Sequence, residues 1–250
     1  MNAALRQTLS PARRSCGALS VLVAGETCVL RCSGALWLPA YRTLVAGDLH
    51  LEKGSAYAAR GQMLPPYDSR ATLDRLEAEI ADLAPDTVVL LGDSFHDSKA
   101  LPRMAIDDRD RLERLAHGRE WLWIEGNHDR ETLSLQTGLA SPLAGRVLGE
   151  MTLGALRLTH EPQPATSEDG RHGEVAGHLH PAARVVGYGR GVWRPCFLTD
   201  GSRLLLPAFG AFTGGLNVRD PAISGLFATP PMAGVLGRDK VHAIAWSNLP

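Results

Sequence analysis

Three apolar runs in the first half of the chain each end in glycine followed by an acid or amide, and this feature constrains the fold most strongly. The runs are TLVAGD at 43–48, TVVLLGD at 87–93 and WLWIEGN at 121–127. Continuous β-branched, aliphatic or aromatic runs of this length are typical of strands buried on both faces. The pattern predicts neighbouring buried strands whose ends present polar groups at one edge of a sheet.

Helical patterns separate these predicted strands. Apolar residues recur at spacings of three and four between residues 73 and 83, and Pro85 ends the predicted helix. A second helix is predicted over 107–118, with acids in its first turn and Gly118 as its stop. The alternation of strand and helix predicts a layered α/β arrangement whose strand ends open on the same edge.

The rest of the chain is dominated by strand patterns. Two short strands are predicted over 19–25 and 27–32, and residues 36–47 are interpreted as one further strand that leads into the first glycine. Strands joined by Gly-rich or Asp-Gly turns are predicted for the second half, at 151–160, 174–181, 182–207 and 240–246.

Length and composition favour one globular unit. With 250 residues, 44% of them hydrophobic, the chain can bury a full core, and we expect a single domain over 19–250 after a flexible basic tail at 1–18. The formal net charge is −1, so no overall basic field suggests nucleic acid as a partner. Attraction for anions would have to be local.

The cysteine pattern and the length of the apolar runs indicate in which cellular compartment the protein works and which kind of metal site it can form. The four cysteines include one C-x3-C pair, Cys28 and Cys32, without the second pair that a structural zinc site needs, so reduced thiols are expected. No apolar run reaches the length of a membrane span, and no signal-peptide core is recognisable. We expect a cytoplasmic protein without a membrane partner.

The polar residues at the predicted strand ends all bind metals or move protons. They are Asp48, His50, Asp93, Asn127, His128, His160, His178 and His180. Residues two apart in an extended segment point to the same side, so we expect the pairs 48/50 and 178/180 each to face one cavity. Glycine precedes these groups at positions 47, 92, 126 and 177, where we expect sharp turns and close backbone approach.

Five blocks in order, D-x-H, G-D, G-N-H-D, H and G-H-x-H, resemble the calcineurin-like metallophosphoesterase superfamily. A single D-x-H or G-D would mean little, because an isolated histidine or a Gly-Asp turn is common. The resemblance implies an α/β fold of four layers, in which helices flank two packed mixed β-sheets and the metal site lies at the strand ends.

The resemblance also implies two divalent metal ions. One would be held by Asp48, His50, Asp93 and His180, and the other by Asp93, Asn127, His160 and His178, so that Asp93 bridges them. Imidazole, carboxylate and amide donors without thiolate suit Mn, Fe or Zn better than Mg or Ca, and Mn is expected from the family. Two such ions, two aspartates and a hydroxide leave a local charge of about +1, which attracts phosphate.

In such a site the ions activate a bridging water for attack on phosphorus. The histidine that matches His128 in the family is not a ligand but protonates the leaving oxygen, and Asp129 is placed to orient it. A role for Asp129 in capping the turn after the strand is the alternative.

Further segments resemble the bacterial ligase-associated DNA damage response endonuclease (PdeM) family over about residues 19–245. They include LHLEKGSAYAARGQMLPPYDSRATL at 49–73, GDSFHD at 92–97, THEP at 159–162, AGHLHPAARV at 176–185 and PAFGAFTGGLNV at 207–218. That likeness implies Mn-dependent cleavage of phosphodiesters in DNA, with DNA as the substrate. It also implies a functional link to an ATP-dependent DNA ligase, an exonuclease and a helicase in DNA repair.

Several residues near the ligand blocks are candidates for substrate contact. Lys53 and Arg60, with Tyr57 and Tyr67, could touch a nucleic-acid backbone or stack a base, or the cations could be solvated while the tyrosines pack. His96 could approach the substrate or support the ligands. The arginines at 184, 190 and 194 flank a predicted hairpin and could form an electropositive rim, although exposed hairpins commonly carry such charges.

Two rival functions remain open at this stage. A phosphomonoesterase, acting on protein or nucleotide, would use the same metals and the same proton donor, but its dianionic substrate calls for extra cations. A non-enzymatic assembly subunit is the second rival, since some superfamily members have lost ligands; here no ligand is missing. For the segment 207–218, packing near the cavity is the expected role.

Overall fold

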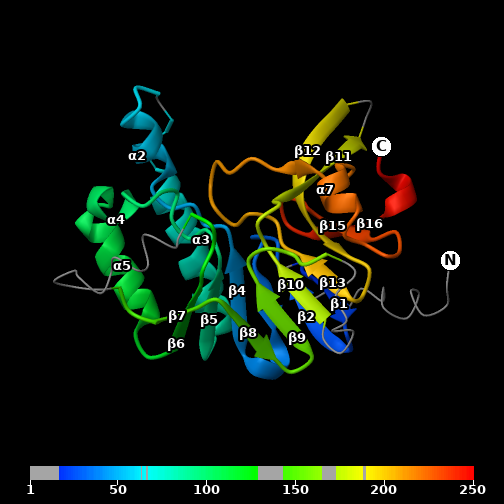
Figure 1. The fold of residues 1–250 in the computed structure, drawn as a ribbon, viewed down its shortest axis with the longest axis horizontal. Helices are drawn as coiled ribbons and strands as arrows, with labels where there is room; N and C mark the ends of the chain where they lie inside the picture. Colours follow the sequence, from blue (N-terminus) through cyan, green and yellow to red (C-terminus); the bar gives the residue numbers. More distant parts are fainter. Residues whose placement is uncertain (1–16, 63, 66, 129–142, 165–172, 188–189) are drawn as a thin grey trace.

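The computed structural model describes residues 17–62, 64–65, 67–128, 143–164, 173–187 and 190–250, and all structural statements below refer to them. Their strands form two mixed sheets, one of seven strands and one of nine, which pack face to face (Figure 1). The expected α/β arrangement of two packed mixed sheets flanked by helices is therefore confirmed.

The seven-stranded sheet carries the three glycine-terminated runs side by side. Its order along the sheet is β1 (Leu19–Val23), β2 (Glu26–Leu30), β3 (Leu36–Leu38), β4 (Thr43–Gly47), β5 (Thr87–Leu91), β6 (Glu120–Ile124) and β7 (Arg146–Leu148). Neighbours from β1 to β4 are antiparallel, and neighbours from β4 to β7 are parallel. The carboxyl ends of β4, β5 and β6 consequently meet at one edge.

The single strand predicted over 36–47 is wrong. Pro39 begins a short 3-10 turn, Pro39–Tyr41, and Arg42 follows in the left-handed conformation with φ 45°. Proline fixes its own φ and has no N–H for a sheet ladder, so the chain reverses there. The segment becomes two antiparallel strands, with Leu38 paired to Thr43.

The nine-stranded sheet contains the second half of the chain. Its order is β14 (Leu216–Asn217), β11 (Pro181–Gly187), β12 (Arg190–Thr199), β13 (Arg203–Leu205), β10 (Gly173–Ala176), β9 (Leu156–Thr159) and β8 (Glu150–Leu153), with β15 (Met232–Leu236) and β16 (Val241–Ala245) joined to β12. β9 and β10 are parallel, so Thr159 and Ala176 end side by side. The blocks that contain His160 and His178 therefore start at the same edge.

Both predicted helices are present, as α3 (Asp68–Leu83) and α5 (Ile106–Ala116). Three shorter helices were not predicted, α2 (Lys53–Ala58), α4 (Ala100–Arg103) and α7 (Pro221–Ser224). Helices of four to six residues show too few turns to produce a periodic pattern, and only tertiary packing stabilises them.

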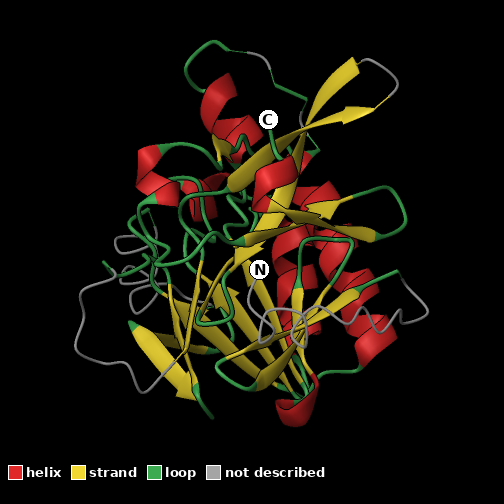
Figure 2. Ribbon diagram, turned by 90° about the vertical axis from the view of Figure 1, so that its right-hand side faces the viewer, coloured by secondary structure: helices red, strands yellow, loops and turns green. Residues whose placement is uncertain are grey.

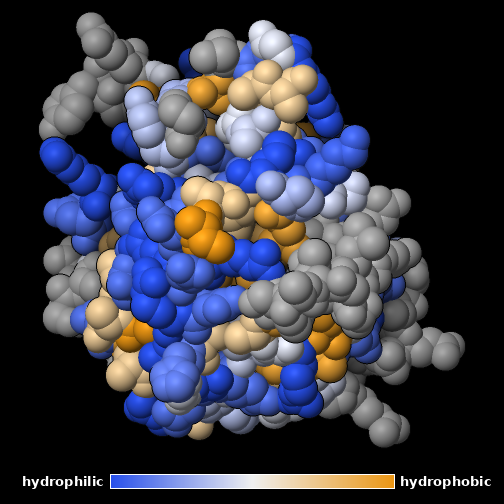
Figure 3. Space-filling model, turned by 90° about the vertical axis from the view of Figure 1, so that its left-hand side faces the viewer, coloured by the Kyte–Doolittle hydropathy of each residue, from blue (hydrophilic) through white to orange (hydrophobic). Residues whose placement is uncertain are grey.

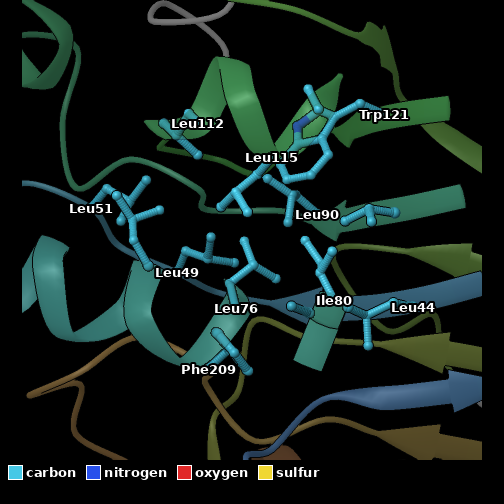
Figure 4. Close-up of a cluster of buried hydrophobic side chains, with 14 of the residues drawn as sticks. Leu44, Leu49, Leu51, Leu76, Ile80, Leu90, Leu112, Leu115, Trp121 and Phe209 are labelled. Atoms are coloured by element: carbon cyan, nitrogen blue, oxygen red, sulfur yellow. The ribbon is translucent and has the colours of Figure 1, made fainter. Parts of the chain in front are cut away.

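Three clusters of buried side chains separate the layers. The first lies between the seven-stranded sheet and the helices, where Leu76 and Leu115 face Leu44, Leu90 and Trp121 (Figure 4). The second lies between the two sheets. The third covers the other face of the nine-stranded sheet and includes Ile223 of the short helix α7. Long helices therefore cover the outer face of the seven-stranded sheet, whereas, of the described α-helices, only the short helix α7 packs on the outer face of the nine-stranded sheet.

The outer face of the helical side is mostly hydrophilic, with hydrophobic groups only in small patches (Figure 3). This agrees with helices that turn their apolar sides toward the sheet. Among the described helices, none has the combination of length and apolar character that crossing a bilayer requires.

Candidate metal centre

Two groups of potential ligands lie at the shared edge of the sheets. Asp48, His50 and His180 form one group, and Asp93, His160 and His178 form the other. Within each group the three ligand atoms are within 4.8 Å of one another. The structure thus brings together six residues from four separate sequence blocks, in the grouping that the family resemblance implies.

The first two ligand blocks are held by backbone hydrogen bonds that continue the β4–β5 pairing. The N–H of Asp48 donates to the carbonyl of Gly92 at 3.2 Å, and the N–H of His50 donates to the carbonyl of Asp93 at 2.9 Å. Asp48 is fully buried, and Asp93 is nearly so. These carboxylates therefore have fixed positions.

Backbone amides also fix the two carboxylates from the opposite side. The N–H of His178 lies 3.0 and 3.2 Å from the two carboxylate oxygens of Asp48, and the N–H of His128 donates to Oδ1 of Asp93 at 2.9 Å. Asn127, the remaining predicted ligand, places Oδ1 2.9 Å from Nε2 of His160 and so joins the second group.

The expected extended geometry of the ligand pairs is wrong, although both pairs do face the cavity. Asp48, His50, Asp93, His178 and His180 all have positive φ, between 40° and 66°. These five are half of the ten non-glycine residues with positive φ among the described residues. Such conformations cost roughly 1–3 kcal/mol each and persist only where surrounding contacts impose them. The strain is concentrated at the ligands.

Glycine is required for a steric reason at three of the four predicted positions, and at Gly177 a Cβ would lie 2.5 Å from Oδ2 of Asp48. Gly92 has φ 72°, and a Cβ there would overlap the ring of His160; a Cβ on Gly126 would overlap the backbone N and Oδ1 of Asp93. At Gly47 a Cβ would meet only ordinary contacts, the nearest at 3.5 Å, so the expected close approach is wrong there. The sharp turn falls on Asp48 instead.

The spacing of the donor atoms fits metal ions. Two ligands bonded at about 2.1 Å with an angle between about 90° and 110° lie about 3.0–3.4 Å apart. The observed separations are 3.3 Å between Nε2 of His50 and Nε2 of His180, 3.4 Å between His180 and Asp48, and 3.1 Å between His178 and His160. Both groups contain only nitrogen and oxygen donors, which suits Mn, Fe or Zn.

Burial keeps the imidazoles of His50 and His160 neutral, as metal binding requires. It lowers the pKa of His50 to about 2, with smaller contributions from the nearby His180, His96 and His128. Burial is also the main reason why the pKa of His160 is lowered, although Asp48 and Asp93 oppose the shift. Neither ring must lose a proton to bind a cation near neutral pH.

His128 lies beside the ligands but is open to solvent. Its side chain is 47% exposed, and its ring lies 5.8 Å from the ring of His50, centre to centre. His96 is stacked nearly parallel to His128 at 6.2 Å. The second predicted catalytic residue, Asp129, lies outside the described residues.

The other predicted contact residues differ in how close they come to the site. Lys53 and His96 line a pocket of about 390 Å³ together with His50, His178 and His180. Tyr57 packs near His96, with ring centres 5.8 Å apart, whereas Arg60 and Tyr67 are exposed. Burial lowers the pKa of Lys53, whose Nζ donates to the carbonyl of Phe212 at 3.2 Å.

The loop at 207–218 does more than the packing role expected from the sequence. Phe209 is buried in the helical core as predicted, but Thr213, Gly214 and Gly215 line the same pocket as the ligand histidines. Their small size was visible in the sequence; their position next to His180 depends on the pairing of β14 with β11.

The chain is similar in sequence or in fold to known proteins. The sequence pattern of the calcineurin-like phosphoesterase family matches residues 41–187, more than half of the chain. The crystal structure of Pseudomonas putida nuclease MPE is similar over 91% of this chain and 100% of that chain, with 29% identity and a TM-score of 0.67. The Escherichia coli phosphoesterase YfcE matches at 20% identity over 83% of this chain and 94% of its own, with a TM-score of 0.36. No curated protein matches the chain.

The fold and the paired ligand groups define a metal-dependent phosphoesterase, a hydrolase of phosphate esters. The chain belongs to the calcineurin-like phosphoesterase family. Its resemblance to that family, found from the five sequence blocks, is thereby confirmed. Family membership and the intact ligand groups favour an enzyme over a non-enzymatic assembly subunit.

Proposed function

We propose that the protein is a phosphodiesterase that uses two divalent metal ions, Mn²⁺ in this proposal, to cleave DNA. The observation that carries this proposal is the pair of ligand groups that line one pocket beside the exposed His128. The similarity to a nuclease of known structure, P. putida MPE, supports a nucleic acid as the substrate class.

In this proposal each ion has its own ligands and one ligand is shared. Asp48, His50 and His180 would hold the first ion, Asn127, His160 and His178 would hold the second, and Asp93 would be the shared ligand. Its burial and its hydrogen bond from the His128 N–H leave the carboxylate little freedom to reorient.

Bound metal ions supply a water of lowered pKa as the nucleophile and positive charge for the phosphate oxygens. The chain itself supplies the proton for the leaving oxygen from His128, which is exposed enough to meet a substrate and not itself buried among the ligands. Asp129 is proposed to orient that ring. The near-parallel His96 keeps the ring of His128 in place and borders the substrate.

The pocket favours a diester over a monoester. A monoester dianion calls for additional cations, and Lys53 is the only Lys or Arg that lines the pocket beside the ligand histidines, within the described part of the chain. A second pocket of about 250 Å³ adjoins the first through His180 and Thr213–Gly215. The two together give room for an ester arm on each side of the phosphate.

A role in DNA repair in the cytoplasm, with a functional link to an ATP-dependent DNA ligase, an exonuclease and a helicase, is part of the proposal. It is supported by the likeness of segments such as residues 49–73 and 207–218 to the ligase-associated endonucleases.

The test compares substrates on one preparation. Hydrolysis of bis(p-nitrophenyl) phosphate and of p-nitrophenyl phosphate is measured with Mn²⁺ and with chelator, followed by nicking of single-stranded and duplex DNA. We expect Mn²⁺-dependent cleavage of the diester and of DNA. His117→Ala, which removes an exposed histidine after α5, is the matched control and should keep full activity.

Hydrolysis of the monoester alone would contradict the nuclease proposal and favour a phosphatase. Activity that survives in Asp93→Asn would show that the reaction occurs at another site.

A further inference from the structure

Trp193 stands apart from the other tryptophans of the chain. All five lie within the described residues, and Trp193 alone is exposed, at 55%. The other four are buried or partly covered: Trp37, Trp121, Trp123 and Trp246. Arg219 covers the ring of Trp246 at 4.1 Å. Tryptophan is enriched at interfaces because its ring combines a large apolar surface with a polar N–H, so an exposed indole that lines a pocket is a candidate for ligand contact.

The ring lies on a projecting hairpin beside a cation. Trp193 of β12 pairs directly with Arg184 of β11, and the hairpin extends away from the body of the molecule (Figure 1, Figure 2). The guanidinium of Arg184 lies within 3.0 Å of the position that a Cβ on Gly191 would take. Because Gly191 and Trp193 are two apart on one strand, Arg184 and Trp193 share a face.

This face is continuous with the metal centre. Trp193 and Arg194 line the pocket of about 250 Å³. This pocket adjoins the pocket of the ligand histidines, because His180 and Thr213–Gly215 line both. A chain whose phosphate sits at the metal centre would therefore pass the loop at Thr213–Gly215 and reach Trp193 next.

We propose that this hairpin face binds single-stranded DNA, with an unpaired base stacked on Trp193 and a backbone phosphate contacted by Arg184. The inference rests on the proposed nuclease function and names the residues that hold the DNA strand next to the metal centre. Stacking on an aromatic ring needs a free base face, which a duplex hides between neighbouring base pairs.

The arrangement fits DNA better than a second copy of the chain. A ring next to a guanidinium offers one group for the base and one for the phosphate, which is the combination that single-strand binding surfaces use. Exposed Arg184 also brings positive charge to this face of a protein whose net charge is −1.

The first experiment measures KM and kcat of the Mn²⁺-loaded protein on a single-stranded oligothymidylate and on bis(p-nitrophenyl) phosphate. Loss of one stacked base weakens binding about 5- to 100-fold, so Trp193→Ala should raise KM for the oligonucleotide by that factor. Its kinetics on the small diester, which is too short to reach the hairpin, should not change. Trp193→Phe keeps a ring and should restore most of the loss.

Two further variants separate the base contact from the phosphate contact. Arg184→Ala should lower the slope of log KM against log salt by about 0.7, the value for one phosphate contact on a single strand. Val192→Ala is the matched control, because Val192 is exposed on the opposite face of the same strand and pairs with Val185. It should behave as the wild type on both substrates.

Tryptophan fluorescence gives a direct readout. Oligothymidylate should protect the emission of the exposed indole from quenching by acrylamide, and Trp193→Phe should remove that component. Wild-type kinetics of Trp193→Ala on single-stranded DNA would overturn the inference while leaving the nuclease proposal intact. A change of oligomeric state in Trp193→Ala with unchanged DNA cleavage would assign the face to self-association and overturn it as well. Failure of the wild type to cleave any DNA would instead refute the proposed function.

Discussion

The floor and the rim of the site are built in different ways. The floor, defined here as Asp48, His50, Asp93 and His160, is buried, and three of its four residues have positive φ. The rim, defined as Lys53, His128 and the hairpin face around Trp193, is partly or largely exposed and lies on short helices, loops and a projecting hairpin.

This difference separates chemistry from recognition. The floor is fixed by several independent contacts per residue, so that ligand positions are set before any ion or substrate binds. The rim has few such contacts, and its residues can change with little cost in folding. Variants in the two regions should therefore fail in different ways: floor variants in metal content and stability, rim variants in substrate kinetics.

The largest effect is expected at the shared carboxylate of the floor. Asp93→Asn preserves the shape of the side chain but removes its charge, and we expect kcat/KM on the small diester to fall by about 10³-fold or more. Metal analysis should show fewer than two Mn²⁺ ions per chain. Two ions retained with normal activity would remove Asp93 from the ligand set.

His128 tests whether a rim residue takes part in the chemistry. His128→Ala should lower kcat on DNA by about 10²-fold or more, because the leaving alkoxide then departs without a positioned proton. The loss should be much smaller on bis(p-nitrophenyl) phosphate, since nitrophenolate needs no proton to leave. An equal loss on both substrates, or a lower metal content, would place His128 with the floor.

Gly92 tests the packing of the floor. Gly92→Ala combines a strained φ with overlap of the His160 ring, and we expect the free energy of unfolding to fall by about 2–5 kcal/mol. Gly118→Ala is matched to it, because Gly118 has φ 77° and open space around the missing Cβ. That variant should cost only about 1 kcal/mol in urea denaturation. Equal losses of unfolding free energy in the two variants would mean that the overlap with the His160 ring does not destabilise the fold.

Acid should destabilise the metal-free floor. The pKa of His50 is about 2 in the folded chain and near 6.5 once the ring is exposed by unfolding, so the unfolded state binds the extra proton between these values. Stability of the chelated protein should therefore fall as pH drops below about 6.5, with His50 contributing up to about 1.4 kcal/mol per pH unit.

His50→Asn should remove the contribution of His50 to the slope of unfolding free energy against pH. His117→Asn, at an exposed position, should leave that slope unchanged. An unchanged slope in His50→Asn would show that this ring does not control the acid response.

The smallest effect is expected at Lys53. Its Nζ already donates to the Phe212 carbonyl, and its role in the rim is one of several substrate contacts. Lys53→Met should raise KM for DNA by about three- to tenfold with kcat and metal content unchanged. A loss of bound metal in Lys53→Met would contradict the separation of rim from floor.

The sequence alone determined the chemical content of the site. Apolar runs ending in Gly-Asp or Gly-Asn predict buried strands with ligands at their ends, and the order of the five blocks indicated both the family and the grouping of ligands. This works because strand burial and ligand chemistry are local properties of a short segment.

Only the tertiary structure decided how the ligands are held and what surrounds them. The positive φ of Asp48 and His178 arises from hydrogen bonds between segments about 130 residues apart, which no local pattern reveals. The short helix α2 and the position of Trp193 beside the Thr213–Gly215 loop likewise depend on packing and sheet pairing between distant segments. Local sequence fixes which groups a segment offers, whereas the geometry of their meeting is set by contacts that exist only in the folded chain.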